Sequence, residues 1–100
     1  MAREVTWTES ASDDLAEIAA HIAKDSEFYA ATIVREVVSA ARSLTVLSER
    51  GRMVREYRDP AIRQLLVRDY RLLYKTTDSS VYVLRIIHGA RMLPPRAQSA

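Results

Sequence analysis

Residues 62–87, which read IRQLLVRDYRLLYKTTDSSVYVLRII, contain three runs with the composition of β-strands. The runs are rich in β-branched, aromatic and leucine side chains and cover residues 62–68, 70–75 and 81–87. Asp69 separates the first two runs, and the turn-forming cluster 77–80 separates the last two. Because connections this short join neighbouring antiparallel strands, this stretch predicts the greater part of a small antiparallel sheet.

Both faces of this sheet are predicted to be apolar. The last run has apolar residues at both parities: Val81, Val83 and Ile87 on one face, and Tyr82, Leu84 and Ile86 on the other. In the middle run, Tyr70, Leu72 and Tyr74 are predicted on one face and Leu73 on the other. Two helices can cover only one face, so the second face is expected to carry apolar groups interleaved with arginine, which is typical of a partner-binding surface. The alternative is that the C-terminal residues 94–100 fold back over it.

The first half of the chain predicts one strand and two helices. Residues 3–8 alternate apolar and polar side chains, as a short strand does, and either Thr8 or Ser10 is suited to cap the helix that follows. We expect this helix to end at about residue 24, and a second helix to run from about residue 27 to about residue 47. The apolar stripe of the second helix is expected to comprise Ala30, Val34, Val37, Val38, Ala41 and Leu44.

The predicted fold class is therefore α+β, with the element order β-α-α-β-β-β. An N-terminal strand and a helical hairpin pack on a small, mainly antiparallel sheet. A brief extended piece is also expected at residues 53–54. With 100 residues, the chain is expected to form a single domain. Its parts are the strand and hairpin in 1–49, a basic β-rich half in 50–93 and a tail in 94–100.

Composition excludes several kinds of site. The chain has no cysteine, which excludes disulfides, thiolate metal sites and a cysteine nucleophile. Its two glycines are too few for a glycine-rich nucleotide-binding loop. We therefore predict neither a cofactor nor a metal. No stretch has the pattern of a signal peptide or a membrane span, so we expect a cytoplasmic protein with no membrane partner.

Charge is divided unevenly along the chain. Residues 1–49 carry four basic and nine acidic side chains, a balance of −5, whereas residues 50–100 carry eleven basic and four acidic ones, a balance of +7. Ten of those eleven cations are arginine, whose planar guanidinium suits phosphates and carboxylates. One explanation is an anionic partner, either nucleic acid or an acidic protein segment. The other is a solvated face that keeps a small protein soluble.

The basic half also contains the residues best suited to binding or catalysis: Glu56, Arg63, Tyr70, Arg71, Tyr74, Arg85, His88 and Arg91. Arginines beside tyrosines suit phosphate binding with base stacking. In an RNA-cleaving site, Glu56 could serve as a base, His88 could move a proton and the arginines could hold the charge of a phosphorane. Each residue also has a structural interpretation, with the tyrosines in the core, His88 in a turn and the arginines paired with nearby aspartates.

Taken in order, these residues resemble the RelE/ParE superfamily of bacterial type II toxins. The resemblance covers nearly the whole length, and the first half contributes Val5-x-Trp7 and Ala11-x-x-Asp14-Leu15-x-x-Ile18. The second half contributes Gly51-Arg52-x-Val54-x-Glu56, Arg63-x-Leu65-x-Val67-x-x-Tyr70-Arg71-x-x-Tyr74 and Val83-x-Arg85-x-x-His88-Gly89-x-Arg91. The central block and the His-Gly-x-Arg ending are most similar to the ParE branch.

The resemblance implies a toxin neutralised by a cognate antitoxin whose C-terminal segment wraps the second sheet face. Operator DNA would be reached only indirectly, through the antitoxin. ParE-like members poison DNA gyrase and block replication, and this is the interpretation we favour. The residues that bind antitoxin or target would be Arg63, Tyr70, Arg71, Tyr74, Arg85, His88 and Arg91.

RelE-like members instead enter the ribosome and cut mRNA, and the catalytic residues would then be Glu56, Arg63, Arg71 and His88. RelE-type nucleases tend to carry lysine-rich tracts and often a C-terminal tyrosine. Here the basic half has one lysine, Lys75, and no tyrosine follows Tyr82. These departures favour the ParE interpretation. A third possibility is a non-toxic protein that binds the antitoxin as a co-repressor.

Overall fold

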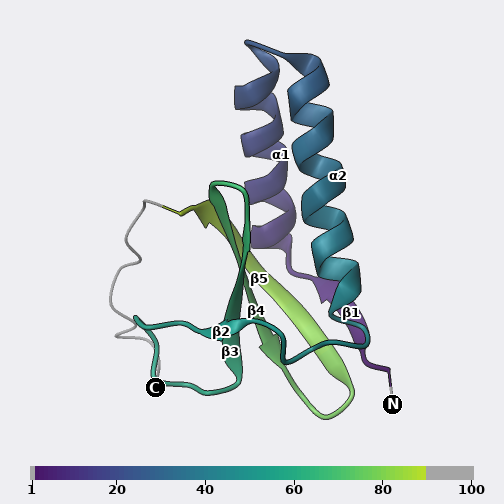
Figure 1. The fold of residues 1–100 in the computed structure, drawn as a ribbon, viewed down its shortest axis with the longest axis vertical. Helices are drawn as coiled ribbons and strands as arrows, with labels where there is room; N and C mark the ends of the chain where they lie inside the picture. The colour runs from purple at the N-terminus through teal and green to yellow at the C-terminus, as the bar shows by residue number, and fades with distance from the viewer. Residues whose placement is uncertain (1, 90–100) are drawn as a thin grey trace.

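The computed structural model describes residues 2–89 of the chain, and its architecture confirms the predicted α+β class (Figure 1). Its elements, in chain order, are β1 (Glu4–Trp7), α1 (Glu9–Ala23), α2 (Glu27–Ser43), β2 (Arg52–Met53), β3 (Ile62–Val67), β4 (Tyr70–Thr76) and β5 (Ser80–His88). The strands form one sheet in the order β1-β5-β4-β3-β2. Within the described residues, β1 pairs in parallel with β5 and all other pairs are antiparallel. The brief extended piece expected near residue 53 forms β2.

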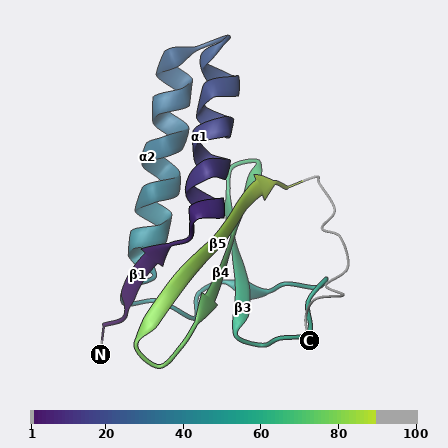
Figure 2. The same ribbon diagram turned by 180° about the vertical axis from the view of Figure 1, so that it is seen from behind.

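Thr8, one of the two residues expected to cap the first helix, caps α1, and Ser26 caps α2. Oγ1 of Thr8 accepts a hydrogen bond from the N–H of Ala11 (3.1 Å), and Oγ of Ser26 accepts one from the N–H of Tyr29 (3.0 Å). Figures 1 and 2 show that the two helices stand side by side and extend well beyond the sheet. Within residues 2–89, no helix is long and apolar enough to cross a membrane.

The second helix is shorter than predicted, because it ends at Ser43 rather than near residue 47. The carbonyl of Thr45 accepts a hydrogen bond from the N–H of Arg3 (2.8 Å). The hydroxyl of Ser48, which is buried, accepts a second bond from the Arg3 guanidinium. These contacts fix the chain beside the start of β1, so it leaves the helical course there.

The buried stripe of α2 also differs in part from the prediction. The buried residues of the helix are Ala30, Ile33, Val37 and Ala41. Ile33 was absent from the predicted stripe, whereas Val34 and Val38 are only half-buried and line a groove beside α1. Steps of three and four residues from Ala30 keep positions 33, 37 and 41 on one side of the helix, and positions 34 and 38 lie next to that line.

A β-bulge at Leu84 changes the predicted faces of β5. The register against β4 shifts between Val83 and Arg85, which leaves Leu84 as an extra residue on its strand. Beyond the bulge the side-chain alternation reverses. Ile86 therefore packs in the core beneath the helices, and Ile87 packs on the other face. The prediction that Ile87 shares a face with the first residues of this strand is wrong.

Apolar side chains form two clusters, one on each face of the sheet. The buried residues of the larger, helix-side cluster are Ala11, Ile33, Val37, Ala41, Leu44, Leu65, Val67, Leu72, Tyr74, Val81, Val83 and Ile86. Those of the smaller cluster are Val54, Ile62, Leu73 and Ile87, with Tyr57 and Leu84 packed against them. Val54 and Tyr57 belong to the connection between β2 and β3, so this connection covers part of the second face. The expectation that the chain leaves this face uncovered is wrong to that extent, and residues 94–100 lie outside the described residues.

Candidate partner-binding surface

Arg71 forms a buried polar centre on the second face of the sheet. The residue is 8% exposed. Its Nε donates a hydrogen bond to Oε1 of Gln64 (2.6 Å), and its two Nη atoms donate to the two carboxylate oxygens of Glu56 (3.1 Å each). Two-point pairing of this kind is stronger and more directional than a single ion contact. The pair attaches the connection between β2 and β3 to the sheet.

Tyr74 and Arg63 both hold Gly51 at the start of β2. The Tyr74 side chain is fully buried, and its hydroxyl accepts a hydrogen bond from the N–H of Gly51 (2.9 Å). Nη1 of Arg63 donates to the carbonyl of the same glycine (2.9 Å). Burial raises the pKa of the Tyr74 phenol. Tyr74, which the sequence placed among the partner-binding residues, therefore offers no surface to a partner.

The four residues of the predicted ribonuclease site fall into separate groups. Glu56 and Arg71 meet on the second face. Arg63 lies on β3 and His88 on β5, and they pair with residues of β4 that are four positions apart. This places Arg63 and His88 roughly 13 Å apart along the strands and about 10 Å apart across them. The structure does not bring these two side chains together.

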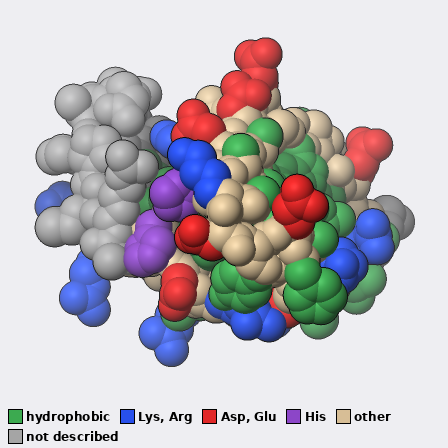
Figure 3. Space-filling model, turned by 90° about the horizontal axis from the view of Figure 1, so that it is seen from above, with side chains coloured by type: hydrophobic (Ala, Val, Ile, Leu, Met, Phe, Trp, Pro, Cys, Tyr) green, Lys and Arg blue, Asp and Glu red, His purple; other side chains and the backbone are tan. Residues whose placement is uncertain are grey.

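His88 lies instead in a pocket between the end of β5 and α1. Its ring packs edge-to-face on Tyr70, with ring centroids 5.6 Å apart, and burial raises the pKa of Tyr70. The pocket has a volume of about 410 Å³, and α1 contributes Asp14, Glu17 and His21 to its lining. Figure 3 shows both histidines side by side on this face. Within the described part of the chain, no group of three or more ligating side chains could hold a metal ion.

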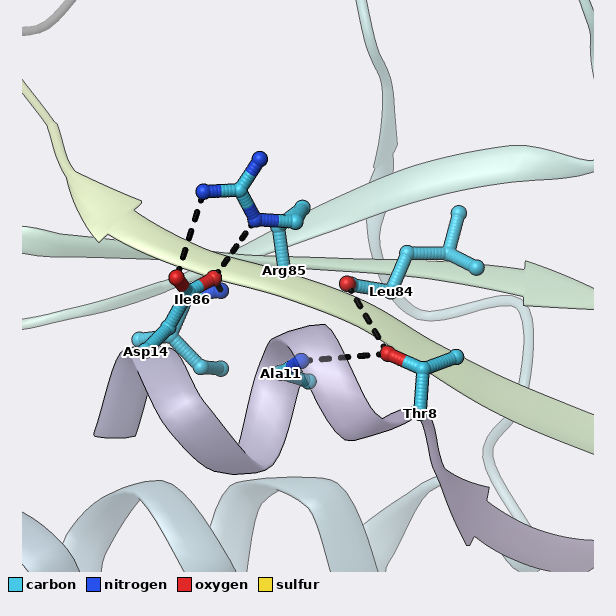
Figure 4. Close-up of polar contacts among 6 residues, drawn as sticks. All are labelled: Thr8, Ala11, Asp14, Leu84, Arg85 and Ile86. Atoms are coloured by element: carbon cyan, nitrogen blue, oxygen red, sulfur yellow. Dashed lines mark hydrogen bonds and ion pairs between the residues drawn. The ribbon is translucent and has the colours of Figure 1, made fainter. Parts of the chain in front are cut away.

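Arg85 is held by Asp14 of α1 (Figure 4). Its Nε and Nη2 donate to the Asp14 carboxylate (2.6 and 3.2 Å), and this contact raises the pKa of the guanidinium. Asp14 also accepts a hydrogen bond from the N–H of Ile86 (3.0 Å), and Oγ1 of Thr8 donates to the carbonyl of Leu84 (3.1 Å). Thr8 and Asp14 thus supply hydrogen-bond partners to backbone groups of β5 beyond the point where its pairing with β1 ends. Asp14 belongs to the family motif, but its role depends on a long-range contact that spacing could not predict.

In the described part of the basic half, the remaining exposed cations lie around β2, in residues 50–58, which we call the arginine loop. Arg52, Arg55 and Arg58 are exposed, and none forms an ion pair with a residue in 2–89. Arg50, also exposed, donates to Oγ of Ser43 (2.8 Å). None of these four loop arginines is among the site residues predicted from the sequence. The irregular pattern before Pro60 could have indicated them, because it predicts a loop and exposed loops often carry binding residues. Arg91 lies outside the described residues.

Comparison with known proteins gives consistent matches over most of the chain. Residues 5–93 match the family described as ParE toxin of type II toxin-antitoxin system, parDE. The chain is also similar to Toxin RelE2 of Caulobacter vibrioides, with 33% identity over 90 residues, which are 89% of this chain and 98% of that protein.

Two solved structures share the fold. A chain of the chromosomal ParDE TA system from P. aeruginosa matches with a TM-score of 0.71 and 21% identity, covering 86% of this chain and 95% of that one. A chain of the E. coli DinJ-YafQ toxin-antitoxin complex matches with a TM-score of 0.61 and 16% identity, covering 94% and 100%. At these identities the likeness concerns the fold alone.

Proposed function

Since the chain belongs to the RelE/ParE superfamily of type II toxin–antitoxin toxins, we propose that it is a toxin that inhibits DNA gyrase and is neutralised by a cognate antitoxin. The match to the ParE family supports this choice of branch. So do the near absence of lysine from the basic half and the lack of a tyrosine after Tyr82.

The observation that carries the proposal is that the candidate catalytic side chains are engaged within the fold. A ribonuclease would need Arg71 to hold a phosphate, but this guanidinium is almost fully buried and hydrogen-bonded to Glu56 and Gln64. Arg63 is committed to the Gly51 carbonyl. Catalysis requires such groups to face the reacting atoms within hydrogen-bond reach. These contacts favour a toxin that acts by binding a protein rather than by cutting RNA.

A supercoiling assay with purified gyrase tests this function. The toxin should inhibit supercoiling or trap cleaved DNA, and prior saturation with the antitoxin should abolish the effect. The antitoxin-saturated toxin is the matched control, because it contains the same protein at the same concentration. Full supercoiling activity at a large molar excess of free toxin would refute the proposal.

We propose that the antitoxin contacts the arginine loop through an acidic, amphipathic segment. The loop contains four exposed arginines and one acidic residue, Glu56, whose carboxylate is already paired with Arg71. Complementary charge of this kind steers association and selects the partner. Both structural matches come from systems or complexes named for a toxin–antitoxin pair. Titration of the toxin with the protein encoded by the adjacent reading frame would test the pairing.

The second candidate function is ribosome-dependent cleavage of mRNA, favoured by the similarity to Toxin RelE2. Primer extension on mRNA from a translating extract would then show cuts at the ribosomal A site. If Arg63→Ala and His88→Ala leave toxicity intact, this function is excluded. Normal growth during expression without antitoxin would instead indicate a non-toxic co-repressor.

A further inference from the structure

The tip of the helical hairpin, residues 24–29, presents the most exposed large apolar side chain of the described residues. Phe28 is 80% exposed and its neighbour Tyr29 is 39% exposed. Isolated apolar residues on a surface are common, but an almost fully exposed phenylalanine beside a second aromatic ring is a strong candidate anchor for a partner. In both ribbon views, the tip lies at the far end of the molecule from β2 (Figures 1 and 2).

Contacts within the fold hold the tip in place. Ser26 caps the start of α2 by accepting a hydrogen bond from the N–H of Tyr29, one member of the aromatic pair. The guanidinium of Arg68, in the turn between β3 and β4, lies 5.7 Å from the centre of the Tyr29 ring. Arg68 also donates to both carboxylate oxygens of Glu36 on α2 (2.6 and 2.8 Å). An anchor on a braced helix loses little conformational entropy on binding, which makes Phe28 suitable as a recognition residue.

The charge of the hairpin distinguishes its partner from the antitoxin. Residues 9–43 carry seven acidic and three basic side chains, a balance of −4. At the tip itself, Lys24, Asp25 and Glu27 are all exposed, so the aromatic pair is flanked by more negative than positive charge. Figure 3, which looks down on the hairpin, shows acidic side chains on several sides of this face. An acidic segment that suits the arginine loop would be repelled here.

We propose that the hairpin tip contacts the target protein, with Phe28 inserted into an apolar pocket that has a basic rim. The toxin then uses two surfaces of opposite charge: the arginine loop for its antitoxin and the tip for its target. This inference rests on the proposed function, in which the target is gyrase. It extends that function by assigning target recognition to the acidic first half of the chain.

The test compares Phe28→Ala with Val46→Ala. Val46 is 76% exposed and lies in the connection after α2, so the control removes a similarly exposed apolar side chain from another surface. Loss of a central aromatic anchor should weaken gyrase inhibition on the order of thirtyfold. Val46→Ala should leave inhibition unchanged. Both variants should keep the wild-type thermal midpoint and antitoxin affinity, because neither side chain is buried.

The outcomes separate this inference from the proposed function. If wild type inhibits gyrase and Phe28→Ala is equally potent, the tip inference fails while the proposed function stands. If wild type has no effect on gyrase, the proposed function fails, and growth arrest becomes the readout for the tip. Phe28→Ala should then lose toxicity and Val46→Ala should keep it, and equal toxicity of the two would overturn the inference. Weakened antitoxin binding in Phe28→Ala would overturn it as well, by making the tip an antitoxin contact.

Discussion

Gly51→Ala should be among the most destabilising single-methyl additions available in this protein. A Cβ atom at position 51 would lie 2.6 Å from the carbonyl oxygen of Gln64 and 2.6 Å from the hydroxyl of Tyr74. Tyr74 is fully buried and cannot swing into solvent to make room. No described glycine has a positive φ, so the cost arises from lack of space rather than from backbone strain.

The magnitude follows from three contributions. Forcing a methyl group into a filled site costs about 1–3 kcal/mol. Displacing the Tyr74 hydroxyl also breaks its hydrogen bond with the Gly51 N–H, which is buried, at about 1–3 kcal/mol. Alanine restricts the unfolded chain more than glycine does, which raises the free energy of unfolding by roughly 0.4–1 kcal/mol. The expected net loss is about 3 kcal/mol, and at ~4–8 °C per kcal/mol for a domain of this size the melting temperature should fall by roughly 12–24 °C.

The assay is urea and thermal unfolding followed by circular dichroism, with Gly89→Ala as the control. At position 89, the nearest atom to the added Cβ is the Asp69 carbonyl oxygen at 3.0 Å, and the site is exposed, so the loss should stay within about 1 kcal/mol. In a Tyr74→Phe background, one of the two closest contacts is absent, so Gly51→Ala should cost about 1 kcal/mol less than in wild type. The reasoning is refuted if Gly51→Ala unfolds like wild type, or if its cost is the same in the Tyr74→Phe background.

Three further predictions concern pH, an edge contact and the arginine loop. Because burial raises the pKa of Tyr74 above its ordinary value of 10.0, the unfolded chain loses this proton first. The free energy of unfolding should therefore fall as pH rises above about 10, and urea titrations at about pH 9 and about pH 11 should show a smaller fall for Tyr74→Phe. Asp14→Ala leaves the N–H of Ile86 without its acceptor and should lower the free energy of unfolding by about 1–2 kcal/mol and speed exchange of that amide. Asp14→Asn keeps an acceptor oxygen and should lose less, so equal losses would contradict this assignment. Changing Arg52, Arg55 and Arg58 together to glutamine should lower antitoxin affinity about tenfold or more and flatten its salt dependence, with the thermal midpoint unchanged. Unaltered affinity in calorimetry would exclude the loop as the antitoxin contact.

Local patterns were sufficient to predict the helices and most strands. Thr8 caps α1, and the turn cluster 77–80 marks the end of β4 and the start of β5, because both features depend on residues close in sequence. The bulge at Leu84 could not be predicted in the same way. Near Leu84 only Arg85 is polar, so the pattern of apolar side chains fits either assignment of these residues to the two faces of the sheet. Only the pairing with β4 decides which side chains lie beneath the helices.

The candidate site was harder to predict because its contacts join distant segments. Glu56 meets Arg71 only after the connection between β2 and β3 folds across the sheet. Tyr74 is buried in the helix-side cluster, and Gly51, which directly precedes β2, donates a hydrogen bond to its hydroxyl. The sequence indicated that these residue types could form a catalytic group. It could not indicate that the fold would use them to fix a loop.

The same contacts explain why this chain prefers arginine to lysine. Arg71 binds Gln64 and Glu56 at once, and Arg68 and Arg85 each contact both oxygens of a carboxylate. A planar guanidinium can bond to two acceptors in fixed directions, whereas an ammonium group acts as a point charge. The only lysine of the basic half, Lys75, makes a single longer ion pair with Asp59 (3.4 Å). Part of the arginine richness of the basic half is therefore a property of folding. An anionic partner is therefore expected to contact the loop arginines that the fold leaves exposed, whatever the total charge of the basic half.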